Sequence, residues 1–190
     1  EEVDAHASYE KVGPSASIGD LKFLDINMDG LITEDDRTNL GNPIPKLTMG
    51  LNFSFDYKNF DFQSYFFSSL GFEIVRNYER NNPLTNRTSY TLNRWTGPGT
   101  SNSTPRVTTA PTSNTLFSDF YVEDGSFIRA QNIQLGYTFN QDNSNLDILK
   151  PWIKASAKSI RFYASINNLF TLTKYQGFDP TTSTGSPLGG

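Results

Sequence analysis

The stretch that most constrains the fold is the segment from Leu47 to Tyr57, LTMGLNFSFDY. Every second residue from Leu47 onward is large and apolar, and the residues between them are small or polar. A period of two places the two sets on opposite faces of a β-strand. The segment is longer than the usual strand of about 5–6 residues and is as long as a tilted strand that crosses a bilayer, roughly 9–11 residues. It predicts a long strand with two contrasting faces, in a membrane barrel or in a soluble sheet.

The same alternation recurs in three further predicted strands. The second covers Phe60–Leu70 after a tight turn at Lys58–Asn59, the third follows Gly125, and the fourth covers Ser159–Leu172. If consecutive strands are antiparallel, the long segments 25–36 and 71–123 and the tail fall at one end of the sheet, and the connections 58–59 and 140–158 fall at the other. Long loops on one side are typical of outer-membrane barrels, where they are extracellular. A soluble sandwich explains the two faces but not this asymmetry.

We therefore predict an all-β chain whose antiparallel up-and-down strands, about four in number, form an incomplete part of a large transmembrane β-barrel. The composition agrees, because aromatic residues make up 14% of the chain and favour strands. No stretch approaches the roughly 18 apolar residues of a transmembrane helix. With no Cys and one His, a disulfide framework, a thiolate zinc site and a histidine-based triad are not expected. The net charge of −4 does not suggest nucleic-acid binding.

Residues 25–36, DINMDGLITEDD, fit the spacing of a calcium-binding loop. Side-chain oxygens recur at its first, third and fifth positions, and a glycine stands at the sixth. The twelfth position holds Asp rather than the bidentate Glu that an EF-hand prefers, and no amphipathic helices flank the loop. The alternative is a turn whose Asp and Asn side chains bond their own backbone. The candidate Ca²⁺ ligands are Asp25, Asn27, Asp29, Leu31 (through its backbone carbonyl) and Asp36.

Four groups of motifs occur in order along the chain. They are GDLKFLDINMDG followed by GNPIPKLTMGLNFSFDYKNFDF (19–62), NRW (93–95) with PR (105–106), YVEDGSFIR (121–129) with LGYT (135–138), and NNLFTLTKY (167–175) with GFDP (177–180). Together they resemble the C-terminal barrel region of the SusC/RagA family of TonB-dependent outer-membrane transporters. On this basis, 19–180 is part of a receptor barrel, 1–18 is a leader segment and 181–190 is an unstructured tail. The acidic, polar start of the chain does not look like a signal peptide, so a fragment is expected.

The resemblance implies a bacterial outer-membrane importer of glycans or peptides rather than an enzyme. Members of this family have a plugged barrel of about 22 strands, act with a SusD-like surface lipoprotein and are driven by TonB through an N-terminal part that this chain lacks. Membrane lipid and an oligosaccharide or peptide substrate are then the other expected partners, and nucleic acid is not. The alternative is a soluble or surface calcium-binding β-module for carbohydrate binding or adhesion. No carboxylate can be placed opposite the acidic loop, so a glycosidase is not predicted.

Two places could contact substrate or partner. The segment 71–123 is rich in aromatic and Arg residues, and binding residues are often found on such loops. The polar face of the strands would line the barrel lumen, where amide and charged groups either bind substrate or only interact with water and plug. The candidate substrate- or partner-binding residues are Tyr78, Tyr90, Arg94 and Trp95 in the loop and Arg161 and Asn167 in the lumen. Trp95 could equally be a packing residue of the loop itself.

Overall fold

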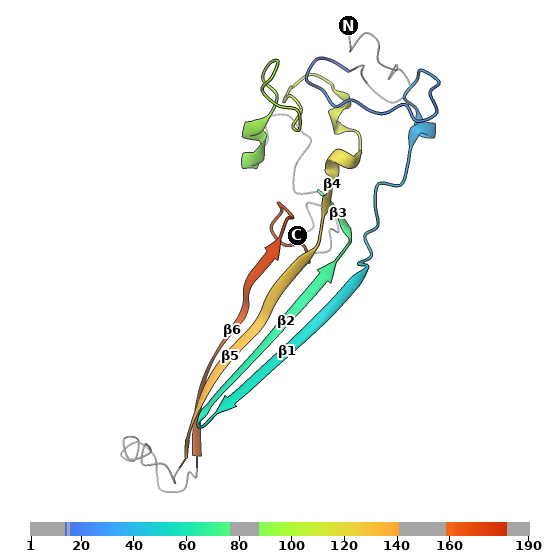
Figure 1. The fold of residues 1–190 in the computed structure, drawn as a ribbon. Coiled ribbons are helices and arrows are strands. Elements are labelled where there is room, and N and C mark those ends of the chain that lie inside the picture. The colour runs from blue at the N-terminus through green and yellow to red at the C-terminus, as the bar shows by residue number, and fades with distance from the viewer. Residues whose placement is uncertain (1–13, 15, 77–87, 141–158, 182–190) are drawn as a thin grey trace. The chain divides into compact units, whose positions relative to one another are not determined.

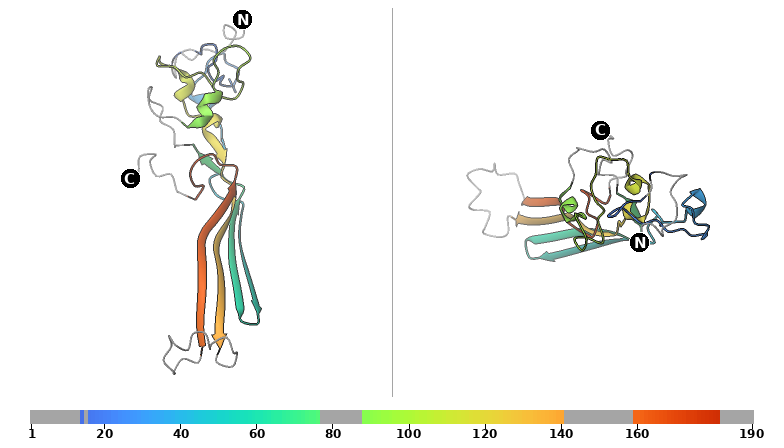
Figure 2. Two further views of the ribbon diagram at one scale, coloured as in Figure 1. Left: turned by 90° about the vertical axis from the view of Figure 1, so that its left-hand side faces the viewer. Right: turned by 90° about the horizontal axis from the view of Figure 1, so that it is seen from above.

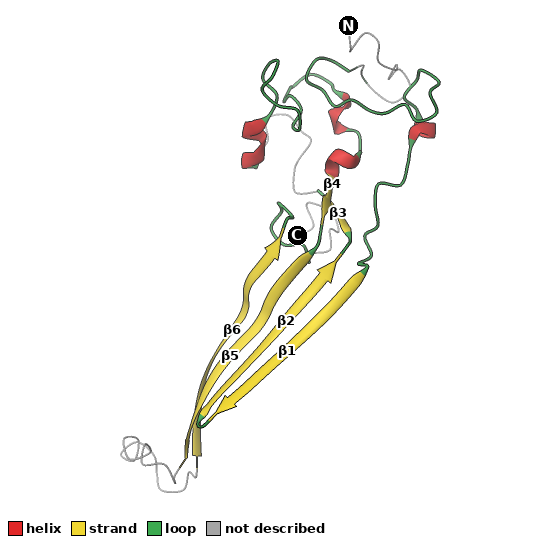
Figure 3. Cartoon of the chain, viewed as in Figure 1, coloured by secondary structure: helices red, strands yellow, loops and turns green. Residues whose placement is uncertain are grey.

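The computed structural model describes residues 14, 16–76, 88–140 and 159–181. The chain divides into two compact units, which we call the loop unit and the sheet unit. The loop unit comprises Glu1–Gly41, Val75–Glu123 and Ser183–Gly190, and the sheet unit comprises Asn42–Ile74 and Asp124–Thr182. The described chain consists of strands and loops, with helical structure limited to short 3-10 turns (Figures 1 and 3).

The sheet unit contains four long strands, and the prediction of four antiparallel strands is confirmed. They are β1 (Leu47–Tyr57), β2 (Phe60–Leu70), β5 (Phe127–Asn140) and β6 (Ser159–Thr173), and they lie in the order β1-β2-β5-β6. Each neighbouring pair is antiparallel. The four strands follow one another across the sheet in every view (Figures 1 and 2). Lys58 adopts a left-handed φ of 56° in the turn between β1 and β2, which allows the tight turn.

The register between strands places the polar side chains in rows across one face. Asn52 on β1 pairs with Tyr65 on β2, Tyr65 pairs with Asn132 on β5, and Asn132 pairs with Asn167 on β6. The register of β5 shifts against both of its neighbours between residues 130 and 132. Asn168 on β6 has a left-handed φ of 51° at the same level. Beyond an irregularity of this kind the alternation is shifted by one residue, so that odd-numbered residues face the side of the sheet that even-numbered residues faced before it.

The opposite face of the sheet is apolar, and no other described element covers it. On β1 the large apolar side chains remain about half exposed, for example Leu51 at 64%, Phe53 at 54% and Phe55 at 55%. The buried apolar side chains of the sheet unit are instead near one end of β5, where Phe127 and Ala130 are 3% and 0% exposed. An uncovered apolar surface of this kind marks a membrane or protein contact.

The segments outside the four long strands form several short elements. Strands β3 (Glu73–Val75) and β4 (Val122–Asp124) pair in a second, two-stranded sheet. The 3-10 turns are η1 (Glu34–Asp36), η2 (Ser89–Asn93), η3 (Ser113–Thr115) and η4 (Asp119–Tyr121). The predicted long loop 71–123 thus carries local structure over its described part. Within the residues described here, no helix is both long and apolar enough to span a membrane.

Candidate functional site

The carboxylate of Asp20 connects several residues of the loop unit, and its side chain is only 1% exposed. It accepts two hydrogen bonds from Arg106, with Nε–Oδ1 2.7 Å and Nη2–Oδ2 3.0 Å. Asn114 Nδ2 donates to Oδ1 at 2.8 Å, and the N–H of Ser17 donates to Oδ2 at 2.9 Å. The side-chain oxygen of Asn114 in turn accepts from the N–H of Leu21 at 2.7 Å. These bonds join the segment around Asp20 to a second segment that lies 86 to 94 residues further along the chain.

Ionisation of Asp20 is favoured despite its burial. Burial opposes the charged form, but hydrogen bonds from Arg106, Ser17 and Asn114, together with the charge of Arg106, outweigh it and hold the pKa of Asp20 below its ordinary value of 3.8. The hydrogen bonds between Arg106 and Asp20, together with the negative charge of Asp20, outweigh burial and raise the pKa of Arg106 above its ordinary value. The pair is therefore fully charged at neutral pH.

Trp95 packs against Gly19, the residue before Asp20. Gly19 has a left-handed φ of 87°, and a Cβ built there would lie 2.4 Å from the Trp95 ring. The backbone also joins the two segments, because the N–H of Arg106 donates to the carbonyl of Gly19 at 2.8 Å. Of the two predicted roles for Trp95, this contact favours packing within the loop unit.

A second cluster surrounds the guanidinium of Arg76, a residue that is 8% exposed. Its Cζ lies 4.3 Å from the ring centroid of Phe120, 4.7 Å from that of Tyr90 and 5.7 Å from that of Tyr121. Nη2 donates to the carbonyl of Phe120 at 3.0 Å, and Nη1 lies 3.5 Å from the Glu123 carboxylate. Cation–π contacts are stronger where the cation is desolvated, so Arg76 holds these rings together.

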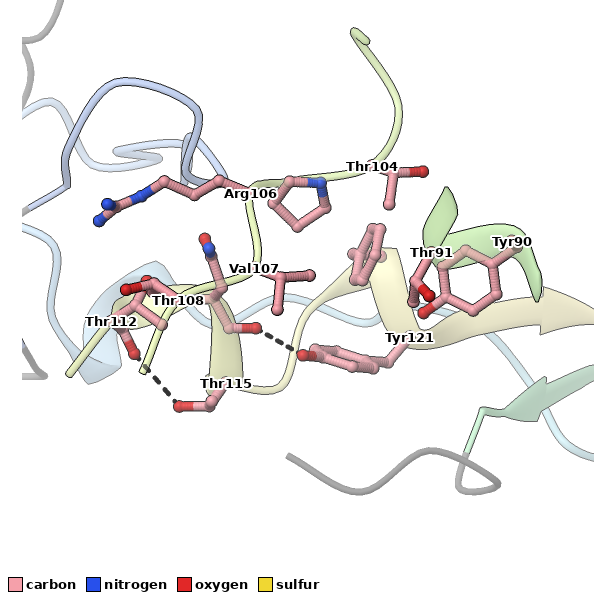
Figure 4. Close-up of a pocket in the computed structure, with 12 residues that line it drawn as sticks. Tyr90, Thr91, Thr104, Arg106, Val107, Thr108, Thr112, Thr115 and Tyr121 are labelled. Atoms are coloured by element: carbon pink, nitrogen blue, oxygen red, sulfur yellow. Dashed lines mark hydrogen bonds between the residues drawn. The ribbon is translucent and has the colours of Figure 1, made fainter. Parts of the chain in front are cut away.

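The same three rings form one wall of a pocket of about 70 Å³. The rest of its lining consists of Pro105, Arg106, Val107, Asn114 and several threonines (Figure 4). The hydroxyl of Tyr121 donates to the carbonyl of Asn114, and Thr115 Oγ1 donates to the carbonyl of Thr112 at 3.3 Å. Figure 4 shows the Arg106 guanidinium pointing away from the aromatic rings.

The predicted calcium-type loop is closed by bonds from its own backbone to its carboxylates. The N–H of Gly30 donates to Asp25 Oδ2 at 2.8 Å, and the N–H of Leu31 donates to Asp29 Oδ1 at 2.8 Å. Asp36 returns to the start of the loop and accepts from the N–H of Ile26 at 2.8 Å. Gly30 has a left-handed φ of 82°, as a sharp turn at the sixth position requires.

Asp36 also caps η1, where its Oδ2 accepts from the N–H of Thr33 at 2.8 Å. The bond from Thr33, with further bonds from the N–H groups of Ile26 and Asn27, lowers the pKa of Asp36. Desolvation acts in the opposite direction but is outweighed. Among the described residues, no group of three or more His, Cys, Asp or Glu side chains is arranged to hold a metal ion. Calcium binding therefore remains a prediction from the spacing of the loop.

On the polar face of the sheet, an ion pair connects two strands that are not neighbours. Arg161 on β6 bonds both carboxylate oxygens of Asp61 on β2, with Nε–Oδ1 2.9 Å. Between them lies Gly136 on β5, where an added Cβ would be 2.3 Å from Asp61 Oδ1. The guanidinium of Arg161 also lies 5.2 Å from the Tyr163 ring centroid. Further along the same face, Asn132 Nδ2 on β5 donates to Asn167 Oδ1 on β6 at 2.7 Å.

At the other end of β5, Arg129 holds the segment that follows β6. Its Nη2 lies 2.6 Å from Asp179 Oδ1, Nη1 donates to Thr181 Oγ1 at 3.2 Å, and Nε donates to Thr171 Oγ1 at 2.9 Å. Burial opposes ionisation of Asp179, but bonds from Thr181 and Arg129 outweigh it and lower the pKa of Asp179. Arg129 and Asp179 belong to two of the sequence motifs, which the structure brings together.

The predicted contact residues are found in separate places. Tyr90 lines the pocket, Arg94 is half-buried with Nη1 3.3 Å from the carbonyl of Thr91, and Tyr78 lies outside the described residues. Arg161 and Asn167 are both on the polar face of β6. Five residues of these clusters were not among the predicted site residues: Asp20, Arg76, Arg106, Asn114 and Arg129. The one available signal was that Asp20, Arg106 and Arg129 all stand within recognised motifs.

Comparison with known proteins gives a consistent result. The TonB-dependent receptor P3 of Formosa agariphila is 36% identical over 171 residues, which are 88% of this chain and 16% of that receptor. The TonB-dependent receptor SusC of Bacteroides thetaiotaomicron is 31% identical over 168 residues, 86% of this chain and 15% of that receptor. The chain thus spans about one sixth of the length of the curated relatives it matches. No family model matches the chain.

Solved structures share the fold. The RagAB peptide importer in its open-open state matches with a TM-score of 0.61 and 23% identity, over 92% of this chain and 19% of that chain. The closed-closed state of the same importer matches with a TM-score of 0.60 over 80% of this chain and 16% of that chain.

A long-stranded antiparallel sheet with one apolar and one polar face, matched to such an importer, is part of the wall of a transmembrane β-barrel. Over the matched length, the chain is homologous to TonB-dependent receptors, SusC among them. The predictions of fold class, family and location in the bacterial outer membrane are confirmed. The relatives are receptors rather than enzymes, as the sequence analysis predicted.

Proposed function

We propose that the whole protein is an outer-membrane, TonB-dependent importer of glycans or peptides that acts with a SusD-like surface lipoprotein. The observation that carries this proposal is the 31–36% identity to TonB-dependent receptors over most of the chain. The two-faced sheet supports it, because a barrel wall needs an apolar face toward lipid and a polar face toward the lumen. A soluble calcium-binding module, the alternative function, would leave the apolar face of β1 without a role.

The proposal is tested on the full-length receptor in its native membrane. We expect recovery in the outer-membrane fraction and a mobility on SDS gels that changes when the sample is boiled, because a closed barrel resists SDS until heated. Uptake of labelled oligosaccharides and labelled peptides is then compared in cells with and without TonB. TonB-dependent uptake of one class would identify the substrate, whereas a soluble receptor without a heat-dependent shift would contradict the importer function.

We further propose that the loop at 25–36 binds Ca²⁺ through Asp25, Asn27, Asp29, the carbonyl of Leu31 and Asp36. All five donors are oxygens, which suit a hard cation, and the left-handed φ of Gly30 supports the loop conformation. Calcium titration of the full-length receptor, followed by thermal unfolding, is the test. A stabilisation that Ca²⁺ but not Mg²⁺ produces, and that Asp25→Asn removes, is expected. An unchanged unfolding temperature at millimolar Ca²⁺ would contradict it.

A further inference from the structure

We propose that the β1–β2 turn, together with a row of aromatic side chains beside it, binds the headgroup of an anionic phospholipid, with the Lys58 ammonium contacting the lipid phosphate. We call this place the headgroup site. It continues the lipid-facing surface of the barrel wall, and it is independent of which substrate the receptor imports. All of its residues belong to the sheet unit.

Four aromatic side chains form one row across the apolar face next to the turn. Tyr57 on β1 pairs in register with Phe60 on β2, and Phe60 pairs with Tyr137 on β5. Tyr137 in turn pairs with Phe162 on β6. The rings of Phe60 and Tyr137 meet edge to face, with their centroids 4.6 Å apart. On this face of the four described strands, tyrosine occurs in this row and in no other. Rings that carry hydroxyls favour the boundary between acyl chains and headgroups.

The length of β1 places the aromatic row at the edge of the membrane. The strand has 11 residues from Leu47 to Tyr57, which span about 33 Å at roughly 3.3 Å per residue. At a tilt of about 40°, this length covers about 25 Å along the membrane normal, which is the height of the apolar band of an outer-membrane barrel. Leu47 and Tyr57 therefore lie at the two boundaries of the band, and Lys58 lies just beyond it, at the depth of the headgroups.

The ammonium group of Lys58 lies on the lipid side of the turn. Its Nζ is 5.2 Å from the ring centroid of Tyr57, which belongs to the apolar face. The turn itself is tied to β5, because the N–H of Thr138 donates to the carbonyl of Asn59 at 2.8 Å and Asn59 Nδ2 donates to the Tyr137 hydroxyl at 3.5 Å. Within the described part of the chain, no carboxylate forms an ion pair with Lys58. An ammonium group beside a tyrosine hydroxyl suits a phosphate oxygen.

The other end of the apolar face is built differently. Leu47 pairs there with Leu70, and Ile128 pairs with Leu172, so no aromatic row crosses the face at that boundary. Lys46, which directly precedes β1, provides a cation at the same end. The two lysines therefore allow a comparison between a cation with an aromatic row beside it and a cation without one.

The test uses the full-length receptor in lipid nanodiscs of phosphatidylcholine alone or of an equal mixture with phosphatidylglycerol. The rate at which an amine-reactive ester acylates each lysine is followed by peptide mass spectrometry. A bound phosphate shields the amine, so we expect phosphatidylglycerol to slow acylation of Lys58 about fivefold more than that of Lys46, as for one lysine contact with an anionic surface. Lys46 is the internal control, because the general surface charge of the membrane acts on both amines.

Variants give a second measurement, the rise in unfolding temperature that phosphatidylglycerol produces. We expect this rise to be smaller in Lys58→Gln and to be kept in Lys58→Arg, because a guanidinium also binds phosphate. Tyr57→Leu should reduce it as well, since the ring that holds the ammonium is lost. Lys46→Gln is the matched control for Lys58→Gln and should leave the rise unchanged. Every variant is first checked for the heat-dependent gel shift of a closed barrel.

Three results would overturn the headgroup site. Equal slowing of acylation at Lys58 and Lys46 would show an effect of surface charge alone, and equal losses in Lys58→Gln and Lys46→Gln would show the same. Equal protection of Lys58 by inorganic phosphate in phosphatidylcholine nanodiscs would identify a soluble anion as the occupant rather than a lipid. Neither substrate nor lipoprotein enters these measurements, so a failure of the proposed import function would leave their outcome unaffected.

Discussion

Asp61 and Arg161 form an ion pair although they lie 100 residues apart in the sequence and on strands that are not hydrogen-bonded to each other. They meet above Gly136 on the intervening strand, which has no side chain to separate them. Asp61 is also the register partner of Asp56 on β1. Arg161 therefore lies close to a pair of like charges on the polar face, and the three predictions on the sheet begin from this arrangement.

Arg161→Gln should destabilise the full-length barrel more than Asp61→Asn does. Without Arg161, Asp56 and Asp61 are like charges directly opposite each other, which is unfavourable. Asp61→Asn removes this repulsion together with the ion pair. Urea unfolding of the detergent-solubilised receptor measures the loss of stability in both variants. Arg37→Gln, which removes the exposed ion pair with Glu34, is the control. Equal effects of the two sheet variants would contradict the prediction.

Gly136→Ala should be harmful only while Asp61 is present. Its methyl group would lie 2.3 Å from Asp61 Oδ1, so the carboxylate has to move and its bonds to Arg161 are lost. We expect a measurable loss of stability in the wild type, where the charged hydrogen bonds are broken, and almost none in the Asp61→Ala background. Unfolding of the four proteins of this double-mutant cycle gives the coupling free energy between positions 136 and 61. An equal loss of stability in both backgrounds would show that the effect of Gly136→Ala does not come from the ion pair.

Arg129→Gln should loosen the segment after β6 without opening the sheet. The substitution removes the charge that holds Asp179 and shortens the reach toward Thr181. Hydrogen exchange of the Thr181 N–H, which donates to Asp179 at 2.8 Å, should become faster, while the amides of β1 and β2 should be unchanged. Exchange at Thr181 that equals the wild type would mean that Arg129 does not hold the segment.

Acid should weaken the loop unit through Asp20. Because the folded-state pKa of Asp20 is lowered, its stabilisation is complete above the unfolded-state value of about 3.9 and is lost as the pH falls through the folded-state value. The window is therefore below about pH 4. Thermal unfolding of the loop unit, followed through Trp95 fluorescence between pH 2 and 6, should show this loss. In Asp20→Asn the contribution should be absent at every pH, and an unchanged acid profile would contradict the prediction.

Gly19→Ala should destabilise the loop unit at neutral pH. The added methyl meets the rigid Trp95 ring at 2.4 Å, and the left-handed φ of 87° disfavours any side chain. A loss of about 1–3 kcal/mol is expected from overpacking together with strain, measured as the unfolding midpoint from Trp95 fluorescence. Gly99→Ala is a matched control, since it has a similar φ of 80° but open space around it. If both variants lose the same stability, the effect of Gly19→Ala comes from backbone strain alone and not from the contact with Trp95.

The long strands could be predicted from the sequence because each alternates over many residues, and β1 and β2 have the bounds that the pattern indicated. The irregularity between residues 130 and 132 could not, because a bulge depends on pairing with both neighbours. For the same reason, Arg129 was not recognised as a residue of the polar face. The Arg76 cluster was missed because its rings come from segments far along the chain, with no periodic spacing to indicate them.

The bonds of Asp20 have a consequence for the order in which the protein can assemble. Its partners Arg106 and Asn114 are 86 and 94 residues further along the chain, and β1 and β2 lie between them in the sequence. Contacts with such large sequence separation are slow to form, since a long chain has to close first. The β1–β2 hairpin, whose strands are joined by two residues, is free to form from local contacts. The extracellular loops therefore complete their structure late, after the hairpin that their segments flank.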